Sequence, residues 1–161
     1  MTPLLHLGHA DLIERELYSM ALQTFKGLPA RLELPTRHFV AFVASDATSV
    51  DISALEEFSR SLLASGCIYF CAWGPNCEKV HDGFDDVCNP DTPVVMTTWH
   101  AGESLDEALW FFVCDTHPAD DYSSTCGAGI AISIGHSDWA EHIRARLSNI
   151  GELKRIVLDD V

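Results

Sequence analysis

Short apolar runs rich in β-forming residues alternate with helix-like segments along most of this 161-residue chain. This alternation constrains the fold more than any other feature. A strand, a helix and another strand in succession favour a parallel sheet, because right-handed crossover connections place the helices on the faces of the sheet. We therefore expect an α/β fold: a three-layer sandwich with a mainly parallel sheet of four or five strands, Rossmann-like or flavodoxin-like. The pattern does not predict the order of the strands.

The expected strands are the apolar runs that turn residues separate: 38–44, 67–72, 94–98 and 128–134. The expected helices carry apolar residues at helical spacing and cover 51–65, 77–88, 104 until Pro118, and 138–148. Ser104 and Glu107 form a capping box at the start of the third helix. Residues 109–113 would also suit a strand, but the capping box before them favours a helix.

The whole chain, residues 1–161, is expected to form a single domain, since its length is common for one domain with a substantial core. The strand–helix repeats would span about 38–148. Before them, apolar residues near helical spacing predict an N-terminal helix over about 10–26. After them, a short C-terminal strand over about 154–158 is predicted at an edge of the sheet.

The chain is strongly acidic, with 24 Asp and Glu residues against 10 Lys and Arg residues and a formal net charge of −14 at pH 7. Nucleic acid and anionic membranes are not expected as partners, because binding them requires Lys and Arg to neutralise phosphates. A protein partner with a basic surface fits this charge, although acidity also serves solubility alone. With neither signal-peptide features nor an apolar run of membrane-spanning length, the chain is expected to be cytoplasmic, with reduced cysteines.

Four loops would meet at the carboxyl-terminal edge of such a sheet, where ligands bind in open α/β folds. These loops carry polar and aromatic candidates for ligand binding: Ser45, Asp46, Trp73, Asn76, Trp99, Glu103 and Ser137. Trp73 and Trp99 each come directly after a strand, so one interpretation is that the two indoles wall a planar or apolar ligand. The alternative is that each Trp packs on a neighbouring helix.

Residues 67–82, CIYFCAWGPNCEKVHD, contain a strand, a Gly-Pro turn and the start of a helix. Cys77 and His81 are one helical turn apart and share a face. They allow three interpretations: a thiolate nucleophile activated by the helix N-terminus and a histidine, a metal pair completed by His100 or His136, or two core-filling side chains. The candidate catalytic residues are therefore Cys77, His81, His100 and His136.

The cysteine spacing does not favour a metal site. It reads C-x3-C-x5-C-x10-C, whereas zinc ribbons and fingers use paired C-x2-C motifs. Cys67 and Cys71 would lie about 13 Å apart along a strand, too far for one tetrahedral ion. The chain also lacks the glycine-rich nucleotide motifs, the G-x-S-x-G nucleophile motif and H-E-x-x-H. We expect no metal and no cofactor.

Two segments, CAWGPNCEKVHD at 71–82 and TWHAGESLDEALWFF at 98–112, resemble those of an uncharacterised bacterial domain family. The resemblance covers roughly the middle and end of the chain. It implies a self-contained bacterial domain and no particular activity.

Two functional hypotheses follow. The first is a small acidic partner-binding domain, immunity-like or an adaptor, and the lack of a complete catalytic motif favours it. The alternative is a small enzyme or small-molecule sensor that uses a cleft containing Cys and His at the carboxyl-terminal edge of the sheet.

Overall fold

The computed structural model describes residues 3–88 and 94–159. Its centre is a six-stranded sheet in the order β1-β2-β6-β3-β4-β5. β1 is antiparallel to β2, and all other neighbouring strands are parallel. The strands are β1 (Leu5–Ala10), β2 (Arg15–Leu22), β3 (His38–Ala44), β4 (Cys67–Trp73), β5 (Met96–Trp99) and β6 (Cys126–Ile134).

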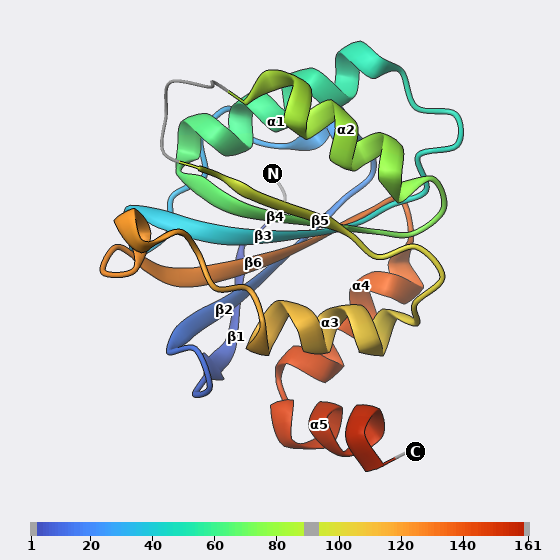
Figure 1. Ribbon diagram of the computed structural model, residues 1–161. Coiled ribbons are helices and arrows are strands. Elements are labelled where there is room, and N and C mark those ends of the chain that lie inside the picture. Colours follow the sequence, from blue (N-terminus) through green and yellow to red (C-terminus); the bar gives the residue numbers. More distant parts are fainter. Residues whose placement is uncertain (1–2, 89–93, 160–161) are drawn as a thin grey trace.

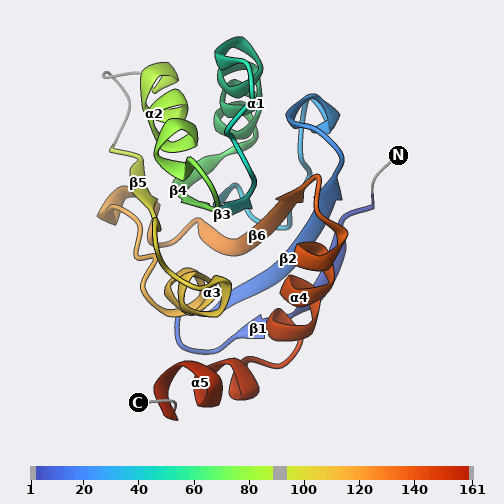
Figure 2. The same cartoon turned by 90° about the vertical axis from the view of Figure 1, so that its right-hand side faces the viewer.

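Helices cover both faces of this sheet (Figures 1 and 2). α1 and α2 pack on one face, α3 and α4 pack on the other, and α5 lies outside α3 and α4. The helices are α1 (Ile52–Ser65), α2 (Cys77–Val87), α3 (Leu105–Cys114), α4 (Ser137–Leu147) and α5 (Ile150–Asp159), with short 3-10 turns η1 (Phe25–Gly27) and η2 (Asp120–Tyr122).

The two faces of the sheet have separate hydrophobic cores. Under α1 and α2, Phe70 stacks on Phe84 with ring centroids 4.3 Å apart. Under α3, Phe42 contacts Phe112 at 5.6 Å. The central strands contribute side chains to both cores, which explains why β3, β4 and β6 read as continuous apolar runs rather than alternating ones.

The expectation of an α/β fold with a mainly parallel sheet is confirmed, although the sheet has six strands rather than four or five. β3, α1, β4, α2, β6 and α4 lie within two residues of their predicted bounds, and α3 is helical as the cap indicated. The Ser104 hydroxyl accepts a hydrogen bond from the backbone N–H of Glu107 at 3.1 Å. The predicted strand 94–98 is β5, which covers Met96–Trp99.

The predicted helix over 10–26 is wrong, because this segment forms the β1–β2 hairpin and η1. Its turn lacks the Gly or Asn that usually marks a hairpin, and Glu14 itself adopts a positive φ of 49°. Leu17 and Tyr18 of β2 pack into opposite cores. Apolar residues therefore occur at both odd and even positions of this strand, and their spacing resembles that of a helix. Parallel pairing with the distant β6 determines the structure here.

The predicted C-terminal strand over 154–158 is also wrong, since these residues belong to α5. Leu153 and Val157, one turn apart, pack against the core under α3 and α4. At the N-terminus of α5 the Asn149 side-chain oxygen accepts from the Glu152 backbone N–H at 3.2 Å, and the Asn149 amide donates to the Glu152 carboxylate at 3.3 Å. This reciprocal cap and the core contacts outweigh the β-branched residues near the end of the chain.

Within the described residues, no helix has the length and apolar character needed to cross a membrane.

Candidate functional site

The carboxyl ends of the parallel strands meet at one edge, and the strand order places a switch point there between β3 and β6. From β3 the chain runs through α1 on one face, whereas from β6 it runs into α4 on the other (Figure 2). Ser45 and Asp46 follow β3, and His136 and Ser137 follow β6. Such a point is the usual place for a ligand in open α/β sheets.

The switch-point residues are mostly held by local contacts. The Ser45 hydroxyl is buried without a hydrogen-bond partner in the described part of the chain. The Asp46 carboxylate accepts hydrogen bonds from the Thr48 hydroxyl at 2.5 Å and the Thr48 backbone N–H at 3.0 Å, which lower the pKa of Asp46. The His136 ring stacks on Trp139, with 3.7 Å between centroids. In the described part of the chain, no hydrogen bond joins Asp46 to His136.

A hollow of about 350 Å³ lies beside the switch point, between the β4–α2 and β5–α3 loops. It brings together five of the predicted site residues: Trp73, Asn76, Cys77, His100 and Glu103. Parallel pairing of β4 with β5 places the two loops side by side, as the reasoning from strand ends anticipated.

Gly74 fixes the wall of this hollow. Its φ is +114°, and a Cβ atom there would lie 2.0 Å from the backbone oxygen of Ser45. The β4–α2 loop therefore packs directly on the β3–α1 loop, where the Ser45 N–H donates to the Trp73 carbonyl at 3.1 Å. Asn76 then opens α2 from a left-handed conformation with φ of 57°.

His100 connects the two loops and also lines the hollow. The residue is buried, and its ring Nδ1 lies 2.5 Å from the Glu103 carboxylate while Nε2 lies 2.9 Å from the Thr98 hydroxyl. The backbone oxygen of Glu103 also accepts a hydrogen bond from the Trp73 indole N–H at 2.9 Å. Both ring nitrogens are engaged, so this network holds the loops in register.

Cys77 belongs to the core under α1 and α2. Burial raises the pKa of its thiol, and this effect outweighs the lowering by backbone N–H groups of His100, Cys77 and Glu78. The thiol is therefore neutral near pH 7, which is opposite to an activated thiolate. No hydrogen bond joins Cys77 to a histidine ring among the described residues, and the core-filling interpretation fits best.

His81 contacts different elements from Cys77. Its ring packs on Trp99 with centroids 4.6 Å apart, Nδ1 lies 3.0 Å from Asp82, and Nε2 lies 3.4 Å from Asp85. Within residues 3–88 and 94–159, no group of three or more His, Cys, Asp or Glu side chains converges to hold a metal. The same part of the chain contains all six cysteines, and all are free thiols.

Trp73 and Trp99 do not share a ligand site. Trp73 packs edge-on against Trp139 of α4 at 5.0 Å, whereas Trp99 packs on His81 of α2. α4 and α2 cover opposite faces of the sheet (Figure 2). The expected pair of indole walls is wrong, and the alternative, packing on neighbouring helices, is what the structure shows.

The outer face of α2 combines acidic and apolar groups. Glu78, Asp82, Asp85 and Asp86 are all exposed there. A groove of about 480 Å³ separates α2 from α1 and is lined by Ile52, Leu55, Asn76, Glu78, Lys79, Asp82, Gly83 and Asp86. The Lys79 ammonium donates to the backbone oxygens of Ala47 and Val50, so it is held by the β3–α1 loop.

Exposed apolar side chains flank these acids on both sides. Ile52 at the start of α1 is 58% exposed, and Met96 and Trp99 on β5 are 39% and 47% exposed. Among residues 3–88 and 94–159, β5 is the last strand of the sheet and no strand pairs with its outer edge. We call the four acids of α2 together with Ile52, Met96 and Trp99 the α2 surface.

A family model described as Domain of unknown function (DUF7684) matches residues 17–150. The chain belongs to this family. The DUF7684 match runs from β2 to the start of α5 and includes every candidate site residue and the α2 surface. It confirms the expected membership of an uncharacterised domain family. A search of curated proteins finds no match.

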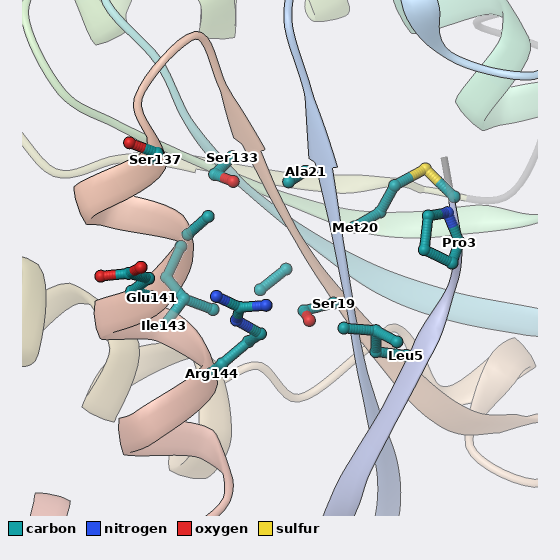
Figure 3. Close-up of a pocket in the computed structure, with 12 residues that line it drawn as sticks. Pro3, Leu5, Ser19, Met20, Ala21, Ser133, Ser137, Glu141, Ile143 and Arg144 are labelled. Atoms are coloured by element: carbon teal, nitrogen blue, oxygen red, sulfur yellow. The ribbon is translucent and has the colours of Figure 1, made fainter. Parts of the chain in front are cut away.

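Sequence reasoning missed a second cavity, of about 250 Å³, between α4 and the strands β2 and β6 (Figure 3). Of the predicted residues only Ser137 lines it. Ser19 was missed because its segment was taken for a helix, and Arg144 because a charged residue on a helix normally faces water. The one available signal was Ser133, a hydroxyl within the otherwise apolar run of β6.

Proposed function

We propose that this DUF7684 chain is a non-enzymatic binding domain whose α2 surface engages a basic region of a partner protein. The supporting observation is the half-exposed Trp99 at the free edge of the sheet, beside four exposed carboxylates of α2. Trp side chains are enriched at the energetic centres of interfaces, and surrounding charges select and steer the partner. Apolar anchors with an acidic surround suit a protein surface rich in Lys and Arg.

The ion pairs of α2 support a basic partner, because they leave the carboxylates of this helix largely unneutralised. Glu78 and Asp86 have no ion-pair partner among the described residues. Within the described residues the ion pairs of Asp82 and Asp85 are with His81, which is not a permanent cation. Lys79 is directed to backbone oxygens instead of these carboxylates. A basic partner would therefore find unneutralised acids here, in a chain whose formal net charge is −14.

For the fold we propose a three-layer, Rossmann-like sandwich. Counted from β3 as the first strand, the order β5-β4-β3-β6 corresponds to 3-2-1-4, the order around the switch point of Rossmann folds. The free state of all six cysteines supports a reducing, cytoplasmic environment.

The alternative, an enzyme or sensor with a cleft containing Cys and His, has less support. Cys77 is buried with a raised thiol pKa, and both ring nitrogens of His100 are engaged. The Cys77 thiol is therefore not activated for nucleophilic attack on a molecule in the hollow.

The test is capture of partners from a lysate of the native host with three tagged baits at low and moderate salt. They are the wild type, an α2 triple variant (Asp82→Asn, Asp85→Asn, Asp86→Asn) and a control triple variant (Glu14→Gln, Glu107→Gln, Glu141→Gln). Both variants remove three exposed acids, and the control takes them from other elements. We expect a stoichiometric partner with the wild type and the control, reduced by salt and by the α2 substitutions.

Two results would contradict the proposal. One is recovery of no stoichiometric partner at either salt concentration. The other is equal recovery with the two triple variants, which would show that net charge matters and the α2 surface does not.

A further inference from the structure

The cavity under α4 lies on the opposite face of the sheet from the α2 surface. Figure 3 shows α4 along one side, β2 and β6 as the floor, and the start of β1 along the other side. Its volume is about 250 Å³, and most of its walls are apolar. The lining residues are Pro3, Leu5, Ser19, Met20, Ala21, Ala131, Ser133, Ser137, Ala140, Glu141, Ile143 and Arg144.

Small residues on two neighbouring strands create the floor. In the parallel register, Ser19 of β2 is opposite Ala131 of β6, and Ala21 is opposite Ser133. Residues two apart on a strand point to the same face, so these four form a continuous low area beneath α4. Ala140 on the helix is equally small. The space that larger side chains would occupy therefore remains open.

Two hydroxyl groups in this floor lack partners. Ser19 is 5% exposed and Ser133 is 3% exposed, and both line the cavity. Within the described part of the chain neither side chain makes a hydrogen bond. Because both residues line the cavity, their hydroxyl groups remain available to hydrogen-bond a polar group placed there.

A guanidinium group is at the mouth of the same cavity. Figure 3 shows the Arg144 side chain directed from α4 over the cavity toward Ser19, while the Glu141 carboxylate points away from it. Arg144 has no ion-pair partner among the described residues. Arg146, two residues later, binds Asp106 at 2.9 Å. In so acidic a chain, an unpaired Arg beside unpartnered hydroxyls favours an anionic group from outside the chain.

We propose that this cavity binds a small monocarboxylic acid with an apolar body. The carboxylate accepts hydrogen bonds from Arg144 and from the Ser19 and Ser133 hydroxyls. The hydrocarbon part packs against Leu5 and Ile143. At about 30 Å³ for each water-sized group, the volume accommodates about eight non-hydrogen atoms, the size of hexanoate.

Charge and wall chemistry distinguish this class from others. Phosphate and dicarboxylates carry more negative charge than one guanidinium offsets. An amine would face the Arg144 cation. A fully apolar ligand would leave both hydroxyls unsatisfied.

Calorimetric titration of the full chain with sodium hexanoate tests the proposal, with hexanamide and inorganic phosphate as comparison ligands. We expect one saturable site for hexanoate with a Kd of about 1 mM or below, which is within reach of eight atoms. Arg144→Gln is expected to weaken hexanoate at least about tenfold and to change hexanamide much less, because only the charged head meets the guanidinium. Arg155→Gln, an exposed Arg on α5, is the matched control and is expected to change neither.

Two further variants change the cavity itself. Ser133→Ala removes one hydroxyl from a buried position that accepts an apolar group, so the chain is expected to fold and to bind hexanoate more weakly. Ala140→Leu fills the space from the helix and is expected to abolish binding of both hexanoate and hexanamide. The proposal is overturned if hexanoate shows no saturable binding up to about 10 mM. Phosphate binding as tight as hexanoate, or hexanoate binding that survives both Arg144→Gln and Ala140→Leu, would overturn it equally.

Discussion

Replacing Gly74 by Ala tests how the loops around the candidate hollow are held. The added Cβ would lie 2.0 Å from the backbone oxygen of Ser45 and 3.0 Å from its carbonyl carbon, at a φ of +114°. Both neighbours are backbone atoms, so no side-chain rotation relieves the contact. The β4–α2 loop must move away from the β3–α1 loop, which would also break the hydrogen bond from the Ser45 N–H to the Trp73 carbonyl.

The magnitude follows from two contributions. A side chain at positive φ costs about 1–2 kcal/mol, and forcing an extra carbon into a packed site costs about 1–3 kcal/mol more. Gly102 provides the matched control, because it has a φ of +77° but a Cβ there meets nothing within 4 Å. Gly102→Ala therefore carries the backbone contribution alone, and the two substitutions are expected to differ by about 2 kcal/mol.

Thermal unfolding followed by far-UV circular dichroism measures this difference. For a chain of this length, about 2 kcal/mol corresponds to a Tm about 4–8 °C lower for Gly74→Ala than for Gly102→Ala. Equal Tm values for the two variants would refute the close approach of the two loops. A gain in stability for Gly74→Ala would refute its positive φ as well.

Three further predictions concern the core. Leu153→Ala is expected to lower the free energy of unfolding by about 2–5 kcal/mol and the exposed Leu158→Ala by less than about 0.5 kcal/mol in urea titrations; equal effects would contradict the position of α5. A thiol reagent at pH 8 is expected to label the half-buried Cys88 and Cys114 before the four buried cysteines, and rapid labelling of all six in the folded protein would be inconsistent with their burial. Burial raises the pKa of the Cys71 thiol from 9 to about 12, so the unfolded chain loses this proton first and stability falls as pH rises from about 9 to 12. This thiol is expected to lower the free energy of unfolding by about 1.4 kcal/mol per pH unit in that range. In Cys71→Ala this part of the pH dependence of urea unfolding should be absent. An unchanged slope would contradict the raised pKa of Cys71.

The central strand–helix repeats could be predicted because their signals are local. Apolar runs mark β3, β4 and β6, and the Ser104 hydroxyl with Glu107 marks the start of α3. The hairpin of β1 and β2 could not be predicted, because its turn has neither Gly nor Asn and its pairing partner β6 is far along the chain. α5 was hidden by β-branched residues in a segment whose helical contacts depend on Leu153 reaching a distant core.

The candidate site was also predicted only in part, since the sequence indicated which loops meet but not how their side chains are oriented. Strand ends predicted that Trp73, Cys77 and His100 would meet, and they line one hollow. The sequence did not predict the face of the sheet on which each side chain lies. That face depends on whether the residue is at an odd or even position of its strand and on which helix covers it. Trp99 therefore lies on the opposite face from Trp73. The cavity under α4 could not be predicted, because its lining residue Ser19 belongs to a strand that the sequence pattern predicted as a helix.

The most direct test of the α2 surface is the affinity of a purified partner for the wild type, the α2 triple variant and the control triple variant at two salt concentrations. Three exposed charge pairs at about 0.2–1 kcal/mol each correspond to a weakening of about tenfold for the α2 triple variant. The control variant is expected to bind like the wild type, and the difference between the two is expected to shrink as salt rises. Equal affinity of the two triple variants at low salt would contradict the claim that the acids of α2 form the binding surface.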